Sequence, residues 1–146
     1  MCMVLYLGSE KALPIIPYNP EQPAFNTKEL DEHEKPVIQH FSKPQVIYVG
    51  SNEGCGCSFR HALYEKGEWS YVISEEGEEA IATQVDHQTL VAYLKTSGLQ
   101  KVEIYACWDG DYALSAEHHE EIAVEDILQP DFFFKERTHY RITIGS

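Results

Sequence analysis

Two cysteines separated by a single glycine lie in a glycine-rich segment that directly follows the apolar run of residues 46–49. Cys55 and Cys57 lie in a segment, residues 50–61, that holds two of the four cysteines and three of the nine glycines. If this segment is extended, the two thiols point to the same side, because side chains alternate along a strand. Its glycines let the backbone approach other groups closely, and we expect positive φ at Gly54 or Gly56. The pattern predicts a thiol-centred site, metal-binding or weakly catalytic.

Further ligands for a metal ion are available elsewhere in the chain. Zinc and softer transition metals take three or four thiolate or imidazole ligands. His61 lies four residues after Cys57, and Cys107 follows a predicted strand, as Cys55 and Cys57 do. We therefore predict a zinc-like transition metal bound by Cys55, Cys57, Cys107 and His61, with Cys2 as a further thiol.

Purely structural roles stay open for the same residues. Structural zinc sites usually present two pairs of closely spaced ligands, and here the second pair is missing. Free cysteine is among the most buried residue types, which favours packing in the core for Cys2 and Cys107. The segment itself is also compatible with a tight irregular connection. Under this second hypothesis the protein is an acidic protein-interaction module with purely structural cysteines and no active site.

A catalytic role would require an activated thiol. Backbone amides in a glycine-rich loop can lower a thiol pKa, Arg60 is the nearest cation, and His61 or His40 could act as a base. The chain contains no P-loop, dinucleotide fingerprint, nucleophile elbow or His-Glu-x-x-His motif. The sequence therefore predicts no particular reaction.

The charge balance limits the kinds of partner. The chain has 24 acidic and 11 basic residues, which gives a formal net charge of −13. A chain of this sign repels phosphate, so we expect neither nucleic-acid nor membrane binding. A protein partner or a homo-oligomer is compatible with the balance. The acidic runs at residues 75–79 and 117–121 could attract a basic partner or serve only solubility.

Length and composition favour one globular unit. A chain of 146 residues predicts a single α+β domain over residues 1–146. Its first residues carry no basic leader, and their apolar run is far shorter than the roughly 20 residues that span a bilayer. We expect a cytoplasmic protein with reduced cysteines.

The hydrophobic patterns predict a mostly antiparallel or mixed sheet with one principal helix. Asp86 as N-cap and Gly98 as C-cap predict this helix at about residues 87–97. Residues 101–106 alternate, which predicts a strand buried only on its even positions. Residues 37–41 are expected to pair with 45–49 in a hairpin, and residues 125–128 to form one helical turn. The remaining predicted strands are residues 3–7, 69–73, 121–124 and 140–144.

Overall fold

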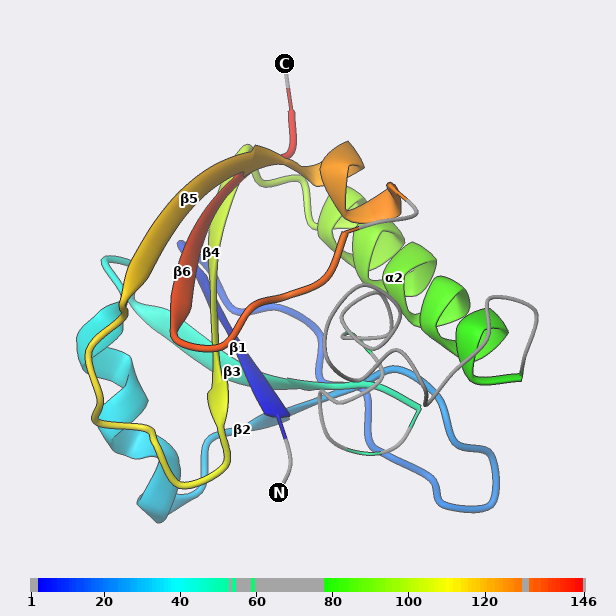
Figure 1. The fold of residues 1–146 in the computed structure, drawn as a ribbon, viewed down its shortest axis with the longest axis horizontal. Helices are drawn as coiled ribbons and strands as arrows, with labels where there is room; N and C mark the ends of the chain where they lie inside the picture. The colour runs from blue at the N-terminus through cyan, green and yellow to red at the C-terminus, as the bar shows by residue number, and fades with distance from the viewer. Residues whose placement is uncertain (1–2, 53, 55–58, 60–77, 130–131, 146) are drawn as a thin grey trace.

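A six-stranded mixed sheet forms the centre of the computed structural model, which describes residues 3–52, 54, 59, 78–129 and 132–145 (Figure 1). The strand order is β2-β3-β1-β4-β6-β5. The predicted α+β fold with one main helix is confirmed. The strands are β1 (Met3–Ser9), β2 (Asn26–Glu29), β3 (Gln45–Gly50), β4 (Lys101–Trp108), β5 (His118–Ala123) and β6 (Thr138–Thr143).

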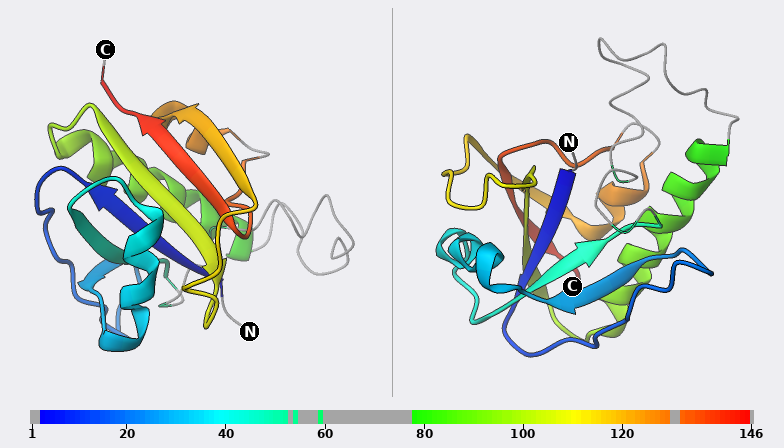
Figure 2. Two further views of the ribbon diagram at one scale, coloured as in Figure 1. Left: turned by 90° about the vertical axis from the view of Figure 1, so that its left-hand side faces the viewer. Right: turned by 90° about the horizontal axis from the view of Figure 1, so that it is seen from below.

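Helical elements cover both faces of the sheet. The α-helix α2 (Glu78–Thr96) lies on one face, and the 3₁₀ helix η1 (Glu32–His40) lies on the opposite face (Figures 1 and 2). A second 3₁₀ helix, η3 (Val124–Leu128), follows β5 and matches the predicted helical turn at residues 125–128. Within the described residues, no helix is both long and apolar enough to cross a membrane.

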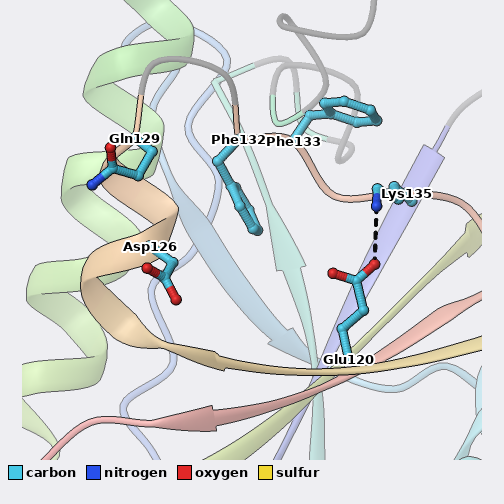
Figure 3. A pocket seen from close by; sticks show the side chains of 6 residues that line it. All are labelled: Glu120, Asp126, Gln129, Phe132, Phe133 and Lys135. Atoms are coloured by element: carbon cyan, nitrogen blue, oxygen red, sulfur yellow. Dashed lines mark hydrogen bonds and ion pairs between the residues drawn. The ribbon is translucent and has the colours of Figure 1, made fainter.

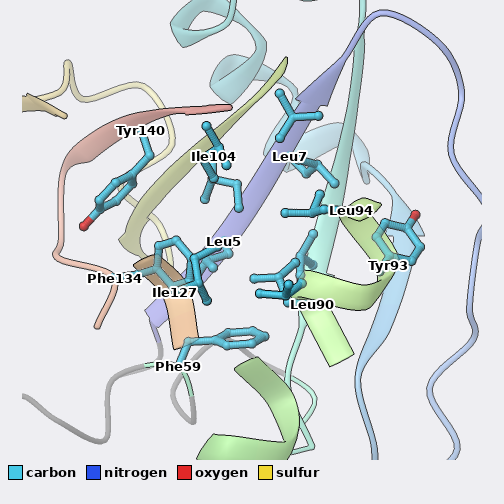
Figure 4. Packing of buried hydrophobic residues seen from close by; sticks show 14 of the residues in the cluster. Leu5, Leu7, Phe59, Leu90, Tyr93, Leu94, Ile104, Ile127, Phe134 and Tyr140 are labelled. Atoms are coloured by element: carbon cyan, nitrogen blue, oxygen red, sulfur yellow. The ribbon is translucent and has the colours of Figure 1, made fainter. Parts of the chain in front are cut away.

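β1 is the central strand, and all seven of its residues are buried. Its odd-numbered residues Leu5 and Leu7 pack against Leu90 and Leu94 of α2 (Figure 4). Its even-numbered residues face η1. Gly8 is required there because a Cβ at this position would lie 2.5 Å from Cδ1 of Phe41. Burial on both faces explains why β1 is an uninterrupted apolar run.

Pairing is antiparallel everywhere except between β5 and β6. β1 pairs with β3 and β4, β4 also pairs with β6, and β2 pairs with β3, all in antiparallel orientation. β5 runs parallel to β6, and the chain crosses between them through η3. The expected mixture of orientations is therefore present, with one parallel pair at an edge.

Helix α2 begins nine residues before the predicted start at residue 87 and ends one residue before the predicted end. Its C-terminus has the expected glycine, because Gly98 has a φ of 76° and the Ser97 amide donates to Leu94 O. Asp86 is not the N-cap. It lies inside the helix and is 1% exposed, so its carboxylate must have partners other than the start of its own helix.

Two local predictions were wrong. Residues 37–41 do not form a strand, because Val37 to His40 belong to η1 and only Val37 of these four is buried. β4 is not half-exposed, because residues 102–107 are all buried. The odd positions of β4 are covered by η1 and by the segment that follows the Asp109–Gly110 turn.

Candidate functional site

The C-terminal end of β3 leads into the cysteine-containing segment. The described residues of segment 50–61 are Gly50, Ser51, Asn52, Gly54 and Phe59. Cys55, Cys57 and His61 lie outside the described residues, as do Cys2 and the predicted strand at residues 69–73. A metal site shared with Cys107 therefore stays a prediction, whereas the chain on both sides of Cys55 and Cys57 can be described.

A tight turn precedes the two cysteines. The Gly54 amide donates to Ser51 O over 2.9 Å, and the Tyr48 hydroxyl donates to Gly54 O. Gly54 has a φ of 85°, which confirms the expectation of positive φ at one of the two glycines. Gly50 meets a different constraint, because a Cβ there would lie 2.6 Å from Asn26 Oδ1 and 2.8 Å from Gly54 O. Both positions need glycine, for different reasons.

Helix α2 binds the chain on both sides of the cysteines. The Asp86 carboxylate accepts hydrogen bonds from the Asn52 amide at 3.1 Å and from Asn52 Nδ2 at 2.5 Å. The next residue, His87, stacks on the Phe59 ring with the centroids 5.7 Å apart and the planes 2° from parallel. His87 Nε2 lies 3.3 Å from Phe59 O, which can only accept, so this nitrogen carries the proton.

These anchors are buried. Asp86, His87 and Phe59 are at most 6% exposed. Figure 4 shows Phe59 at the edge of the apolar cluster that also holds Leu90 and Leu5. Since buried polar groups are costly to leave without a hydrogen bond, these contacts hold Asn52 and Phe59 at fixed points on α2.

Cys107 lies inside β4 and is fully buried. It packs with Val4, Tyr6 and Tyr105 on the face of the sheet opposite α2. Burial raises the pKa of its thiol to about 12, and the nearby carboxylates of Asp111 and Asp109 add to this. A buried thiol of this kind is unreactive, so the packing role left open by the sequence is favoured for Cys107.

His40, the other potential base, lies at the end of η1. Its Nε2 is 2.7 Å from Tyr112 O, and its ring packs on Tyr105 with the centroids 4.4 Å apart. Asp86 and His87, in contrast, lie on the helix that covers the other face. The structure therefore does not bring His40 to the anchors of the cysteine segment.

A group of potential metal ligands that sequence analysis missed lies at the start of η1. One ligand atom from each of Asp31, His33 and Glu34 lies within 4.8 Å of the others. The Glu34 carboxylate is already occupied, since it accepts from the Tyr6 hydroxyl at 2.6 Å and from the Asp31 amide at 3.0 Å. Lys28 Nζ bridges Asp31 and Glu34 at 2.9 and 3.3 Å. These hydrogen bonds and ion pairs attach the start of η1 to the buried Tyr6 hydroxyl. They account for the close approach of the Asp31 and Glu34 side chains.

A second buried polar group lies on the same face, where Ser42 covers β4. The Ser42 amide and hydroxyl donate to the Glu103 carboxylate at 2.9 and 2.5 Å. Burial opposes ionisation of Glu103, but these two hydrogen bonds and nearby His139 outweigh it and lower its pKa. His139 Nε2 lies 3.4 Å from Glu103 Oε1. Burial lowers the pKa of His139, although the nearby Glu103 carboxylate opposes this shift.

The sequence carried only partial signals for these residues. Asp31 and Glu34 have the three-residue spacing of a capping motif, which could have indicated a helix start there. Asp86 and His87 gave no such signal, because their partners lie 34 and 28 residues away. The sequence matches no protein-family model, and no curated protein or solved structure is detectably similar to it.

Proposed function

We propose that the segment following Gly54 forms a thiol-centred metal site, with Cys55 and Cys57 as thiolate ligands and His61, two residues after Phe59, as a third ligand. The ion would be zinc or a transition metal of similar preference, for which thiolate and imidazole are suitable ligands. Cys107 is assigned to the core, because its burial and raised pKa favour packing.

The observation that supports this proposal is the pair of anchors on α2. Asp86 and His87 are adjacent and bind the chain before and after the two cysteines, at Asn52 and Phe59. Only residues 55–58 separate Gly54 from Phe59. Fixing both ends of a short segment lowers the entropy cost of bringing its ligands together, which is what a preorganised site requires.

The proposed compartment and kind of partner follow from the cysteines and the net charge. Free thiolate ligands persist in a reducing compartment, so we propose that the protein is cytoplasmic. Its net charge of −13 supports a protein partner rather than a nucleic acid.

Metal analysis of the full chain, purified without an affinity tag, tests the proposal. After dialysis against zinc and removal of unbound metal, elemental analysis should find about one zinc per chain, as expected for one tetrahedral site. Cys55→Ser and Cys57→Ser should each lose the metal, whereas the control Cys107→Ala should retain it. Circular dichroism establishes that all variants are folded.

Two results would contradict the assignment. If the wild-type chain retains no metal, the alternative of an acidic interaction module with structural cysteines is left. If Cys107→Ala loses the metal while remaining folded, Cys107 is a ligand and its assignment to the core is wrong.

A further inference from the structure

The two edges of the sheet differ in how they are covered. The β2 edge is covered by residues 14–16, because the Thr27 amide donates to Ile16 O at 2.9 Å and the Ile16 amide donates to Thr27 Oγ1 at 2.9 Å. The Tyr93 hydroxyl from α2 donates to Pro14 O and holds this cover down. At the other edge, β5 has no comparable cover among the described residues. Within the described part of the chain, β5 is therefore the edge left open to another strand.

The backbone of β5 has donors that point outward. The His118 amide donates to Arg137 O of the segment leading into β6. Along a strand in a parallel pair, only every second residue directs its backbone N–H and C=O groups to the neighbouring strand. Residues 118, 120 and 122 thus bond to β6, while the amides of His119 and Glu121 lie on the outer edge. Neither outer amide has a hydrogen-bond acceptor in the part of the chain that the structure describes. The next outer amide, that of Ala123, donates to Asp126.

A pocket of about 250 Å³ lies between β5 and the crossover to β6 (Figure 3). Small-molecule sites usually measure about 300–1,000 Å³, so this pocket suits one long side chain better. Glu120 lines the pocket from β5. Its side chain lies on the α2 face of the sheet, as does that of Ile122 two residues later. The pocket is lined by Glu120, Asp126, Gln129, Phe132, Phe133 and Lys135.

The pocket combines aromatic surface with carboxylates. Phe132 and Phe133 are half-buried, and aromatic faces attract cations. Glu120 already binds an amine, because Lys135 Nζ lies 3.0 Å from its Oε2. Asp126 has no ion-pair partner among the described residues, and its Oδ2 accepts only the Ala123 amide. The Asp126 carboxylate can therefore form an ion pair with one more cationic side chain in the pocket.

The segment that forms β5 and η3 is itself acidic. Residues 117–131 contain six acidic residues and no lysine or arginine. Glu117 and Glu125 are paired with Arg137 and Lys95, whereas exposed Glu121 has no ion pair within the described residues. A basic strand approaching this edge meets opposite charge, and an acidic strand, including a second copy of β5, meets repulsion.

We propose that β5 and this pocket bind an extended, lysine- or arginine-containing segment of a protein partner. The segment adds as a strand beside β5, accepting hydrogen bonds from the outer amides of His119 and Glu121. Its residue opposite Glu120 points to the same face and inserts a cationic side chain into the pocket, between the phenylalanine rings and Asp126.

The probe for a binding test is the fluorescein-labelled peptide Lys-Val-Lys-Val-Lys-Val, titrated with the full chain by fluorescence anisotropy. It should bind more tightly than Glu-Val-Glu-Val-Glu-Val, and binding should weaken with salt. A lysine peptide carrying N-methyl groups on alternate residues should bind at least about tenfold more weakly, because it cannot complete a strand pair.

Protein variants separate the edge from the pocket. Glu121→Pro removes an outward amide without breaking the β6 ladder and should weaken binding at least about tenfold. Asp126→Asn keeps an acceptor for Ala123 but removes the charge, and should weaken binding about three- to fivefold. Glu29→Gln makes the same charge change on β2 and should leave binding unchanged.

The proposal is overturned if the glutamate peptide or the N-methylated peptide binds as well as the lysine peptide. Equal binding by wild type, folded Glu121→Pro and Asp126→Asn overturns it as well. A concentration-dependent dimer that Glu121→Pro abolishes would show that the occupant is a second copy of this chain, and would also refute the basic partner.

Discussion

Replacing Gly54 by alanine tests whether the turn before the two cysteines depends on glycine. Gly54 has a φ of 85°, and residues with a Cβ pay about 1–2 kcal/mol in the left-handed region. Alanine also restricts the unfolded chain, which offsets about 0.4–1 kcal/mol of this cost. The added Cβ would lie 3.5 Å from Tyr18 Cζ, an ordinary contact that adds no clash. The net expectation is a loss of about 1 kcal/mol.

Thermal unfolding of the full chain measures this loss. For a chain of this size, 1 kcal/mol lowers Tm by about 2–4 °C. Gly54→Asn should recover part of the loss, because asparagine tolerates positive φ better than alanine does. Gly145→Ala is the matched control: its φ is not positive and its nearest neighbour would be Gln100 at 3.7 Å. If Gly54→Ala melts at or above the wild-type temperature, the turn does not need glycine and this argument for the anchored segment fails.

Three further predictions concern buried groups on the η1 face. Tyr6→Phe removes the 2.6 Å hydrogen bond to Glu34 and should cost about 1.5–3 kcal/mol by urea unfolding; a change below about 0.5 kcal/mol would contradict it. Burial lowers the pKa of His139, so the unfolded chain takes up a proton at a higher pH than the folded chain does. Stability should therefore fall as the pH drops below about 6.5, and less in His139→Gln, whereas equal pH profiles would exclude His139 as the cause. In a variant whose other cysteines are serine, Cys107 should react with Ellman's reagent at least about tenfold more slowly in the folded than in the urea-unfolded state, and similar rates would refute its burial.

Much of the fold was predictable because its signals are local. The apolar run of β1, the alternation in β4 and the glycine after α2 each identified an element from neighbouring residues alone. Residues 37–41 were mispredicted because an apolar pair next to Pro36 resembles a short strand. Of these five residues only Val37 is buried, and it belongs to the 3₁₀ helix η1. The parallel orientation of β5 and β6 has no local signal, since it depends on the crossover through η3.

The candidate site was less predictable because its contacts are distant in sequence. An aspartate before an apolar helical pattern looks like an N-cap, and Asp86 was interpreted in that way. Its actual partner is Asn52, and only the three-dimensional structure places the two together. The positive φ at Gly54 was predictable because glycine adopts the left-handed conformation of a tight turn at little cost. The metal itself stays a prediction, since Cys55, Cys57 and His61 lie outside the described residues.

The two proposed sites belong to different strands but are linked by aromatic contacts. The anchored segment follows β3, whereas the open edge belongs to β5, and three strands, β1, β4 and β6, separate them in the sheet. The crossover to β6 nevertheless reaches the anchors, because the Phe132 ring of the pocket lies 6.2 Å from the His87 ring and the Phe134 amide donates to Phe59 O at 3.4 Å. Residues in contact can be energetically coupled by about 0.5–3 kcal/mol. Cys55→Ser and Glu121→Pro leave these rings unchanged, so Cys55→Ser should remove the metal and keep most of the peptide binding, and Glu121→Pro should weaken peptide binding and keep the metal. If either variant abolishes both properties while the chain remains folded, the two sites are coupled through these contacts, and the assignment of separate functions to β5 and to the cysteine segment is wrong.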